Sequence, residues 1–412
     1  MSTSMSTSTA ISVPTGAGRL RLGRAGSFRV VALSYLALMI AGSAPSPIYP
    51  IYQREWGFAT STLTEIFAVY AVLLLLALLT VGGLSDLIGR RPVLLAGLGL
   101  FTVDMVVFAL APDVQWLFVA RVLQGIAAGL SIGAMTAGLI DLAPPGKVRF
   151  ASVLSALIPA IGLAAGALIS GALVRFGPMP TRLVYLVLGA GFLVLAVLVA
   201  LMPASGDRRP VPLSALTPRM RIPAQARRTF LQVLPALVVP WAQLGFTLSL
   251  TSSVALGVFG VHDVFVDCLL VALPCAAGAL SGFLTRSTDG QRANQFGMVG
   301  MSVGSVITVV GLVIPLVPVY LVGSLIAGLG VGAAISGTFK VLAPLPAEHE
   351  RAEFFAAFFV AGYLAFSLPA VAAGFAIGSF GLVRTAVVYS AVLVVLALVA
   401  MLTGRRRVTR EG

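Results

Sequence analysis

Residues 82–91 read Gly-Gly-Leu-Ser-Asp-Leu-Ile-Gly-Arg-Arg, and Pro92 follows them. This short stretch carries an acid, two arginines and three glycines, and it lies between two long apolar runs. Charged groups are costly inside a bilayer, so they mark the points where a membrane-crossing chain leaves and re-enters it. The stretch therefore predicts a tight charged loop between two membrane-spanning helices.

The composition of the whole chain agrees with a membrane protein. Of its 412 residues, 58% are hydrophobic and only 10% are charged, whereas soluble domains carry about 25% charged residues. The apolar runs are continuous and about 20 residues long, which favours spanning helices over barrel strands. We expect an all-α integral membrane protein with twelve transmembrane helices in two pseudo-symmetric six-helix bundles. The expected spans are 30–50, 62–84, 92–112, 115–142, 151–174, 182–202, 230–257, 263–285, 294–314, 318–341, 353–377 and 383–403.

The positive charge is distributed as topology requires. The net charge is +13, from 27 Lys and Arg against 14 Asp and Glu. Most of the positive residues lie in alternate loops and in the two tails, which by the positive-inside rule places both termini in the cytoplasm. They punctuate the apolar runs and do not gather on one face, which argues against nucleic-acid binding. We expect a multi-pass protein of the plasma membrane.

Two related halves are indicated by an internal repeat. Leu142-Ala143-Pro144 recurs as Leu342-Ala343-Pro344, and residues 282–292 are a degraded copy of the charged loop. Transporters are often built from such repeats, with the site at their interface. The predicted parts are a disordered cytoplasmic N-terminus (1–28), a first bundle (29–202), a cytoplasmic linker (203–229), a second bundle (230–404) and a cytoplasmic tail (405–412).

The loop at 82–91 resembles the loop 2–3 signature of the major facilitator superfamily of secondary transporters, Gly-x-Leu-Ala-Asp-Arg-x-Gly-Arg-Arg. The family usually has Arg where Leu87 stands. The alternative to a family signature is an ordinary charged turn of the kind that any membrane protein needs between two spans. In the family this loop latches the two halves in one state. The resemblance assigns that role here to Gly82, Asp86, Gly89, Arg90, Arg91 and Asp141.

A second group of candidates concerns buried charge and proton coupling. The run Arg121-Val-Leu-Gln124-Gly125 resembles a family motif in which the arginine influences proton transfer. The alternative is an interfacial arginine whose charge reaches the membrane surface. Glu65 and Asp104 lie within apolar spans and are candidate proton carriers, although Glu65 is near enough to a span end to be simply solvated.

Substrate contacts are expected where helices are broken and carry aromatic or amide groups. Prolines at 45, 47 and 50 must interrupt the first span, and Pro240 precedes a Trp-Ala-Gln run. By family analogy we place Tyr49, Trp241, Gln243 and Tyr363 in a substrate cavity, with helix kinking and ordinary packing as the alternative. The small residues of the fifth span fit either an exporter motif or close packing: Gly162, Gly166, Ser170 and Gly171.

The resemblance implies a secondary transporter that works by alternating access. We expect proton-coupled efflux of a small amphiphilic compound by a multidrug-type antiporter. The alternative is proton-coupled uptake of an organic acid that pairs with Arg121, and a non-transporting receptor is a further one. A membrane enzyme would need a His, Asp or Glu cluster at one depth, which the sequence lacks. We expect no cofactor, no metal, a proton gradient as the energy source, and a monomer in the lipid bilayer.

Overall fold

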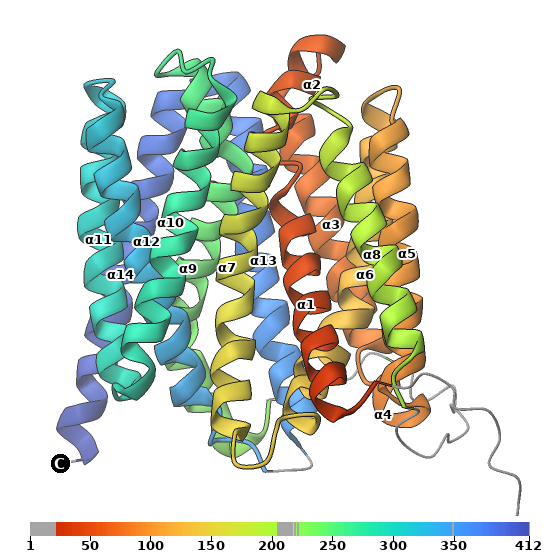
Figure 1. Ribbon diagram of the computed structural model, residues 1–412. Coiled ribbons are helices and arrows are strands. Elements are labelled where there is room, and N and C mark those ends of the chain that lie inside the picture. Colours follow the sequence, from red (N-terminus) through yellow and green to blue (C-terminus); the bar gives the residue numbers. More distant parts are fainter. Residues whose placement is uncertain (1–21, 204–216, 218–219, 221, 348–349, 412) are drawn as a thin grey trace, which may run out of the picture.

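The computed structural model is a bundle of helices, of which twelve are long and apolar enough to cross a bilayer (Figure 1). The structure describes residues 22–203, 217, 220, 222–347 and 350–411, and these ranges contain no strand. The prediction of an all-α membrane protein with twelve spans is confirmed.

The first half contains six long helices and two short ones. The short helices lie at opposite ends of the bundle, α2 (Tyr49–Trp56) at one and α4 (Leu84–Ile88) at the other (Figure 1). We call these the α2 end and the α4 end. The long helices are α1 (Arg24–Ser43), α3 (Thr60–Val81), α5 (Arg90–Leu110), α6 (Val114–Asp141), α7 (Val148–Phe176) and α8 (Leu183–Ala200).

The second half supplies the other six spans. A short 3-10 turn, η2 (Thr285–Ser287), extends one of them toward the α4 end. The long helices are α9 (Ala224–Gly257), α10 (Val264–Leu284), α11 (Gly290–Val313), α12 (Val317–Leu342), α13 (Arg351–Phe380) and α14 (Leu382–Glu411).

The proline run after α1 breaks that span, as predicted. The helix ends at Ser43, a series of turns follows, and α2 starts at Tyr49 with Pro50 in its first turn. Proline lacks a backbone N–H and its ring clashes with the preceding turn, so a regular helix cannot continue through this segment. The last carbonyl groups of α1 are thereby left free to accept hydrogen bonds from other helices.

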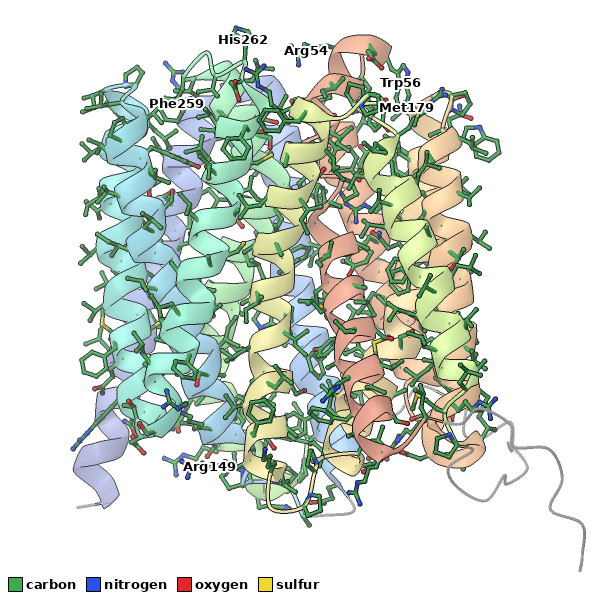
Figure 2. All side chains as sticks on the ribbon, viewed as in Figure 1. Arg54, Trp56, Arg149, Met179, Phe259 and His262 are labelled. Carbon is green, nitrogen blue, oxygen red and sulfur yellow. The ribbon has the colours of Figure 1, made fainter. Side chains whose placement is uncertain are left out.

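Each half packs around its own core. The buried apolar residues of α1–α8 form one cluster, which also takes in a few residues of the second half, and those of α9–α14 form two. In Figure 1, α5, α6 and α8 lie at one side and α11, α12 and α14 at the other, with α7 and α13 between them. Outward-facing side chains such as Leu193, Val194 and Val197 are more than half exposed, as expected of a surface that meets lipid. Charged and polar residues occur at the two ends, for example Arg54 and His262 at the α2 end and Arg149 at the other (Figure 2).

Several predicted boundaries differ from the structure. The first bundle begins earlier than residue 29, because α1 starts at Arg24. The second begins within the predicted linker, because α9 starts at Ala224, and α14 continues through most of the predicted tail. Polar or charged residues extend these helices beyond their apolar segments, which a hydropathy pattern does not detect. Most of the remaining residues of the predicted disordered N-terminus and linker, and the last residue of the predicted tail, lie outside the described residues.

Candidate functional site

The loop at 82–91 folds as a helical turn between α3 and α5. Gly82 caps α3, residues 84–88 form α4, and Gly89 joins α4 to α5. Gly89 has φ 90° and ψ 159°, a backbone region that essentially only glycine adopts. The glycine at this position of the motif is therefore required by the backbone geometry.

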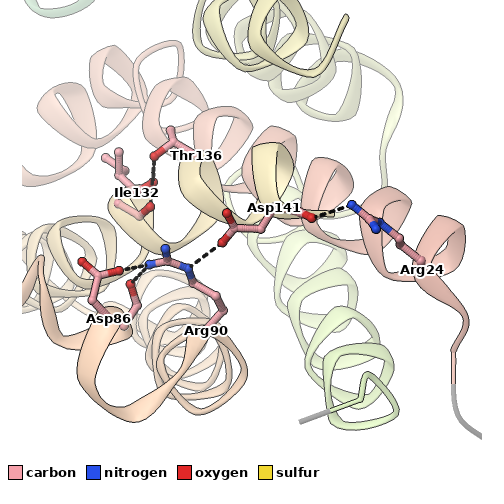
Figure 3. Close-up of polar contacts among 8 residues, drawn as sticks. Arg24, Asp86, Arg90, Ile132, Thr136 and Asp141 are labelled. Atoms are coloured by element: carbon pink, nitrogen blue, oxygen red, sulfur yellow. Dashed lines mark hydrogen bonds and ion pairs between the residues drawn. The ribbon is translucent and has the colours of Figure 1, made fainter. Parts of the chain in front are cut away.

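Arg90 is the centre of an ion-pair network at the α4 end (Figure 3). Its guanidinium is 2.6 Å from the Asp86 carboxylate and 3.3 Å from that of Asp141, and it also contacts the Ser85 hydroxyl. The main-chain carbonyl of Asp141 accepts a further bond from Arg24 at 3.0 Å. The three residues predicted to act together are thus in contact, and all belong to the first bundle.

Arg91 has a separate partner. It donates to the carbonyl oxygen of Ala200 at the end of α8, so it joins α5 to α8 and does not pair with Asp86. Since the Asp86 and Asp141 side chains are 68% and 57% exposed, each ion pair contributes at most about 1 kcal/mol. The network organises this end of the first bundle, and its role as a conformational latch stays a prediction.

Arg121 is fully buried about two turns after the start of α6, and its burial excludes the interfacial alternative. Its Nε donates to the Tyr49 hydroxyl at 2.8 Å, and an Nη donates to the carbonyl of Gly42 at 3.4 Å and to Gln124. Gln124 in turn donates to the carbonyl of Ala41 at 3.2 Å. The broken end of α1 therefore supplies acceptors to the buried cation, and a helix C-terminus carries the partial negative charge that favours it.

Aromatic rings surround the same guanidinium. The rings of Phe67, Tyr70, Tyr49 and Phe108 have centroids 4.9, 5.3, 5.6 and 5.8 Å from its central carbon. A cation over an aromatic face is attracted by the ring quadrupole, and more strongly where water is absent. Sequence reasoning missed Phe67, Tyr70 and Phe108. The spacing of Phe67 and Tyr70, three residues apart on one helix face, was the available signal.

Asp104 completes this buried cluster from α5. Its side chain is fully buried, Arg121 and Gln124 are near enough to act on its charge, and neither carboxyl oxygen has a hydrogen-bond partner. One Nη of Arg121 and the Tyr185 hydroxyl are also without partners. Glu65 is only partly buried on α3 and does not belong to the cluster. The structure thus separates the two candidate acids: Asp104 is enclosed beside Arg121, and Glu65 is not.

The four predicted substrate contacts are divided among three places. Trp241 of α9 and Tyr363 of α13 pack together with ring centroids 4.9 Å apart. Tyr49 is 1% exposed and its hydroxyl is occupied by Arg121, so it belongs to the buried cluster. Gln243 lines a separate cavity inside the second bundle. Only the Trp241–Tyr363 pair keeps the predicted grouping, because helix rotation decides which neighbours a residue meets.

The two halves meet along α7 with α10 and along α3 with α13. At the α2 end Arg175 lies 3.7 Å from Asp263, the single ion pair between the halves among the described residues. Gly171 packs against Cys268, and Gly374 against Thr64. The backbones approach closely at these glycines.

The small residues of α7 serve packing. Gly162 and Gly166 face α1, and the Ser170 hydroxyl donates to the carbonyl of Ala44 at 2.7 Å. Together with Gly171 they let α7 contact both α1 and α10.

Comparison with known proteins identifies one family and several relatives. The family model described as Major Facilitator Superfamily matches residues 31–368. The chain is 34% identical over 155 residues to the tetracycline resistance protein, class C, of Escherichia coli, covering 37% of this chain and 38% of that protein. It is 29% identical over 98 residues to the quinolone resistance protein NorA of Staphylococcus aureus, covering 24% and 25%. The chain thus matches well under half the length of either relative.

Solved structures resemble the whole chain. A bacterial homologue of the human lysosomal transporter Spinster, inward-facing and unoccupied, superposes with a TM-score of 0.75 at 16% identity, covering 93% of this chain and 97% of that one. A POT family transporter in complex with a thioalcohol-conjugated peptide gives 0.75 at 14% identity, covering 93% and 96%. At these identities the likeness shows the fold.

Proposed function

Because the chain belongs to the major facilitator superfamily, and is thus a transporter and not an enzyme, we propose that it exports a small amphiphilic compound in exchange for protons. The proposed location is the plasma membrane, with the α4 end and both termini on the cytoplasmic side. The relatives named for tetracycline and quinolone resistance support the efflux direction, although each matches only part of its length. The concentration of Lys and Arg in the loops at the α4 end supports the orientation.

The observation that carries proton coupling is the buried acid. Asp104 lies inside the first bundle without a hydrogen bond to either oxygen, and an ionisable group at such a position is a functional candidate by default. A carboxyl group can hold a proton as a neutral acid or release it and pair with Arg121. Coupling then requires that the inward-open and outward-open states of the transporter favour different forms of Asp104, one the neutral acid and the other the carboxylate.

The enclosure of Arg121 favours this role over direct recognition of an anionic solute. The guanidinium is surrounded by aromatic rings and bonded to the Gly42 carbonyl, the Tyr49 hydroxyl and Gln124; one Nη lacks a partner, and no part of the side chain is exposed. A transported organic acid would have to displace these contacts to reach the charge. The burial therefore supports an internal partner for Asp104, and it weakens the organic-acid uptake alternative.

Aromatic groups at the meeting of the halves suit an amphiphile. Trp241 and Tyr363 form a ring pair there, and Tyr35 and Tyr70 lie near enough to Tyr363 to act on its hydroxyl. Rings that carry a polar group offer both an apolar face and a hydrogen bond, which is the usual composition of sites for drug-sized ligands. Alternating access would expose these rings to each side of the membrane in turn, as the two bundles rock against each other.

Transport in proteoliposomes tests the proposal. Purified protein is reconstituted, a pH gradient is imposed, and proton flux is followed with cationic, neutral and anionic amphiphiles. We expect Asp104→Asn to abolish solute-driven proton flux while solute exchange without a gradient continues, and Glu65→Gln to retain both. If no solute in the panel drives proton flux through the unmodified protein, antiport is rejected. If Glu65→Gln loses coupling and Asp104→Asn keeps it, the proton carrier has been misassigned.

A further inference from the structure

We propose that the second bundle holds a binding site for one small monovalent cation, with Na⁺ as the fitting ion, in a hydroxyl-lined cavity enclosed by α9, α10, α11, α12 and α14. The cavity leaves about 10 Å³ for the centre of a water-sized guest, about what one bound particle of that size requires. The site does not depend on the exported compound or on Asp104.

Two hydroxyl oxygens of the cavity can only accept hydrogen bonds. Thr247 and Thr308 line it, and their hydroxyls donate to the carbonyls of Gln243 and Gly304, at 2.9 and 2.8 Å. A hydroxyl that has given its proton to the preceding helical turn has only lone pairs left for the cavity. A guest there must donate hydrogen bonds or carry positive charge.

A proline adds a main-chain acceptor. Leu270 and Pro274 both line the cavity, and Pro274 lies inside α10. Since proline has no N–H, it leaves the carbonyl of the residue four positions earlier, Leu270, without its helical partner. In a bilayer such a carbonyl must find another partner, and a cation in the cavity would supply one.

Further hydroxyls line the cavity, together with the side-chain amide of Gln243. Thr251 and Ser324 lie beside the Tyr320 hydroxyl, and Ser305 and Ser390 also line the cavity. Hard cations prefer oxygen ligands of this kind. The lining contains no Lys, Arg or His to oppose a cation, and it contains no carboxylate, so the charge of a divalent ion would not be balanced. A monovalent ion fits these ligands best.

One acid lies close enough to balance a single charge. Asp267 is on α10, almost one turn before Leu270; it is 6% exposed, and its Oδ1 has no hydrogen-bond partner. Ser252 lies beside Asp267, and Asp267 is near enough to Tyr320 to act on the Tyr320 hydroxyl. A buried acid is expensive in a membrane unless a cation or proton compensates it. The function proposed above leaves Asp267 without a role, and the cation site provides one.

By the internal repeat, this cavity in the second half corresponds to the buried cluster around Arg121 in the first half. Ser324 on α12 follows Gln124 on α6 by the same offset that separates Leu342 from Leu142. In the first bundle a fixed cation, the Arg121 guanidinium, fills the corresponding region. In the second bundle the region is hollow and lined by acceptors, so we infer that a mobile cation replaces the fixed one.

Thermal unfolding in detergent tests the site without solute or gradient. The full-length protein is titrated with NaCl, KCl or N-methyl-D-glucamine chloride at constant ionic strength and pH. We expect a saturable rise in Tm of about 2 °C or more with Na⁺ alone, and saturable binding of radioactive Na⁺ near one per chain. Equal Tm values in Na⁺ and N-methyl-D-glucamine, or absence of bound Na⁺, would overturn the proposal and leave only water in the cavity.

Matched variants locate the effect. Thr308→Val removes a lining oxygen and keeps the shape, so we expect at least a tenfold loss of Na⁺ affinity. Thr136→Val is the control, because Thr136 also donates to the carbonyl four residues earlier but lies in the first bundle (Figure 3). Asp267→Asn provides a second test if Thr308→Val does not fold. An equal loss in Thr136→Val, or full Na⁺ binding in both other variants, contradicts the site. Failure here leaves proton-coupled export untouched, since that experiment reads proton flux.

Discussion

The contact between α6 and α3 beside Arg121 can be perturbed by a single methyl group. A Cβ added to Gly125 of α6 would lie 2.6 Å from the Tyr70 carbonyl oxygen and 3.0 Å from the Leu73 Cβ. Ordinary contacts begin at 3.4 Å, so Gly125→Ala requires a local separation of the helices by about 0.8 Å, the difference between 3.4 and 2.6 Å. The helices are close-packed, and the separation cannot be absorbed by a flexible side chain.

The cost of this displacement can be estimated against a matched substitution. Overpacking costs about 1–3 kcal/mol, while Gly→Ala in a helix interior contributes about 0.5–1 kcal/mol in favour. Gly99 of α5 has nothing within 4 Å of an added Cβ, so Gly99→Ala receives the helix gain alone. The two variants should differ by about 1–3 kcal/mol, which corresponds to about 1–4 °C in Tm for a chain of this size.

The assay is thermal unfolding of both variants at one scan rate, with a thiol-reactive dye that reports exposure of the buried Cys268 and Cys275. Since α6 carries Arg121 and α3 carries Tyr70, we also expect solute-driven proton flux to fall in Gly125→Ala and to persist in Gly99→Ala. If Gly125→Ala melts at or above Gly99→Ala, the close packing of α6 on α3 is not what limits this position, and the reasoning is refuted.

Three further substitutions test the loop and the interface between the halves. Gly89→Ala, at φ 90°, should lower the free energy of unfolding by about 1–3 kcal/mol relative to Gly83→Ala, whose Cβ meets nothing within 4 Å; equal midpoints of thermal unfolding would contradict this. Arg90→Ala removes the contacts with Asp86, Asp141 and Ser85, and it should lower the free energy of unfolding by about 1–2 kcal/mol. Arg91→Ala removes the bond to the Ala200 carbonyl and should cost less. If thermal unfolding shows Arg91→Ala to be the less stable variant, the proposed importance of the network is contradicted. Arg175→Ala should change the free energy of unfolding by less than about 1 kcal/mol, because the Arg175–Asp263 pair is about half exposed. The same substitution should speed maleimide labelling of Cys268, measured in a Cys275→Ser background so that Cys268 is the labelled thiol. Arg54→Ala, whose arginine donates within its own helix, is the control, and equal labelling rates in the two variants would show that the Arg175–Asp263 pair does not limit access to Cys268.

The two bundles differ in how they use a shared architecture. The first encloses the Arg121 guanidinium with the Asp104 carboxyl group nearby, and the second encloses hydroxyls around a cavity. If protons bind and leave at Asp104, they change the charge of the first bundle alone. The second bundle would then respond to a different ion, the Na⁺ proposed for its cavity. The α2 end, where Arg175 and Asp263 meet, is where either bundle could influence the closure of the other.

The membrane fold, the broken first span and the charged loop could all be predicted from the amino-acid sequence. These follow from local chemistry: apolar runs of bilayer length, prolines that cannot continue a helix, and an acid with two arginines at a helix boundary. The partnership of Asp86, Arg90 and Asp141 was also predictable, because the family motif names the residues that meet. The burial of Arg121 was not, since a position shortly after Trp116 also fits an interfacial arginine.

The residues that surround each buried polar group, in contrast, became known from the packing of the helices. Helices in a membrane are apolar on all sides, so their hydrophobic pattern does not reveal which face turns inward. The rings of Phe67, Tyr70 and Phe108 therefore meet Arg121 through helix rotations that no periodicity indicates, and Tyr49 leaves the predicted substrate group for the same reason. The cavity beside Asp267 depends on five helices at once. Its acceptors are ordinary serines, threonines and one proline in the sequence, and they become a site only when those helices pack together.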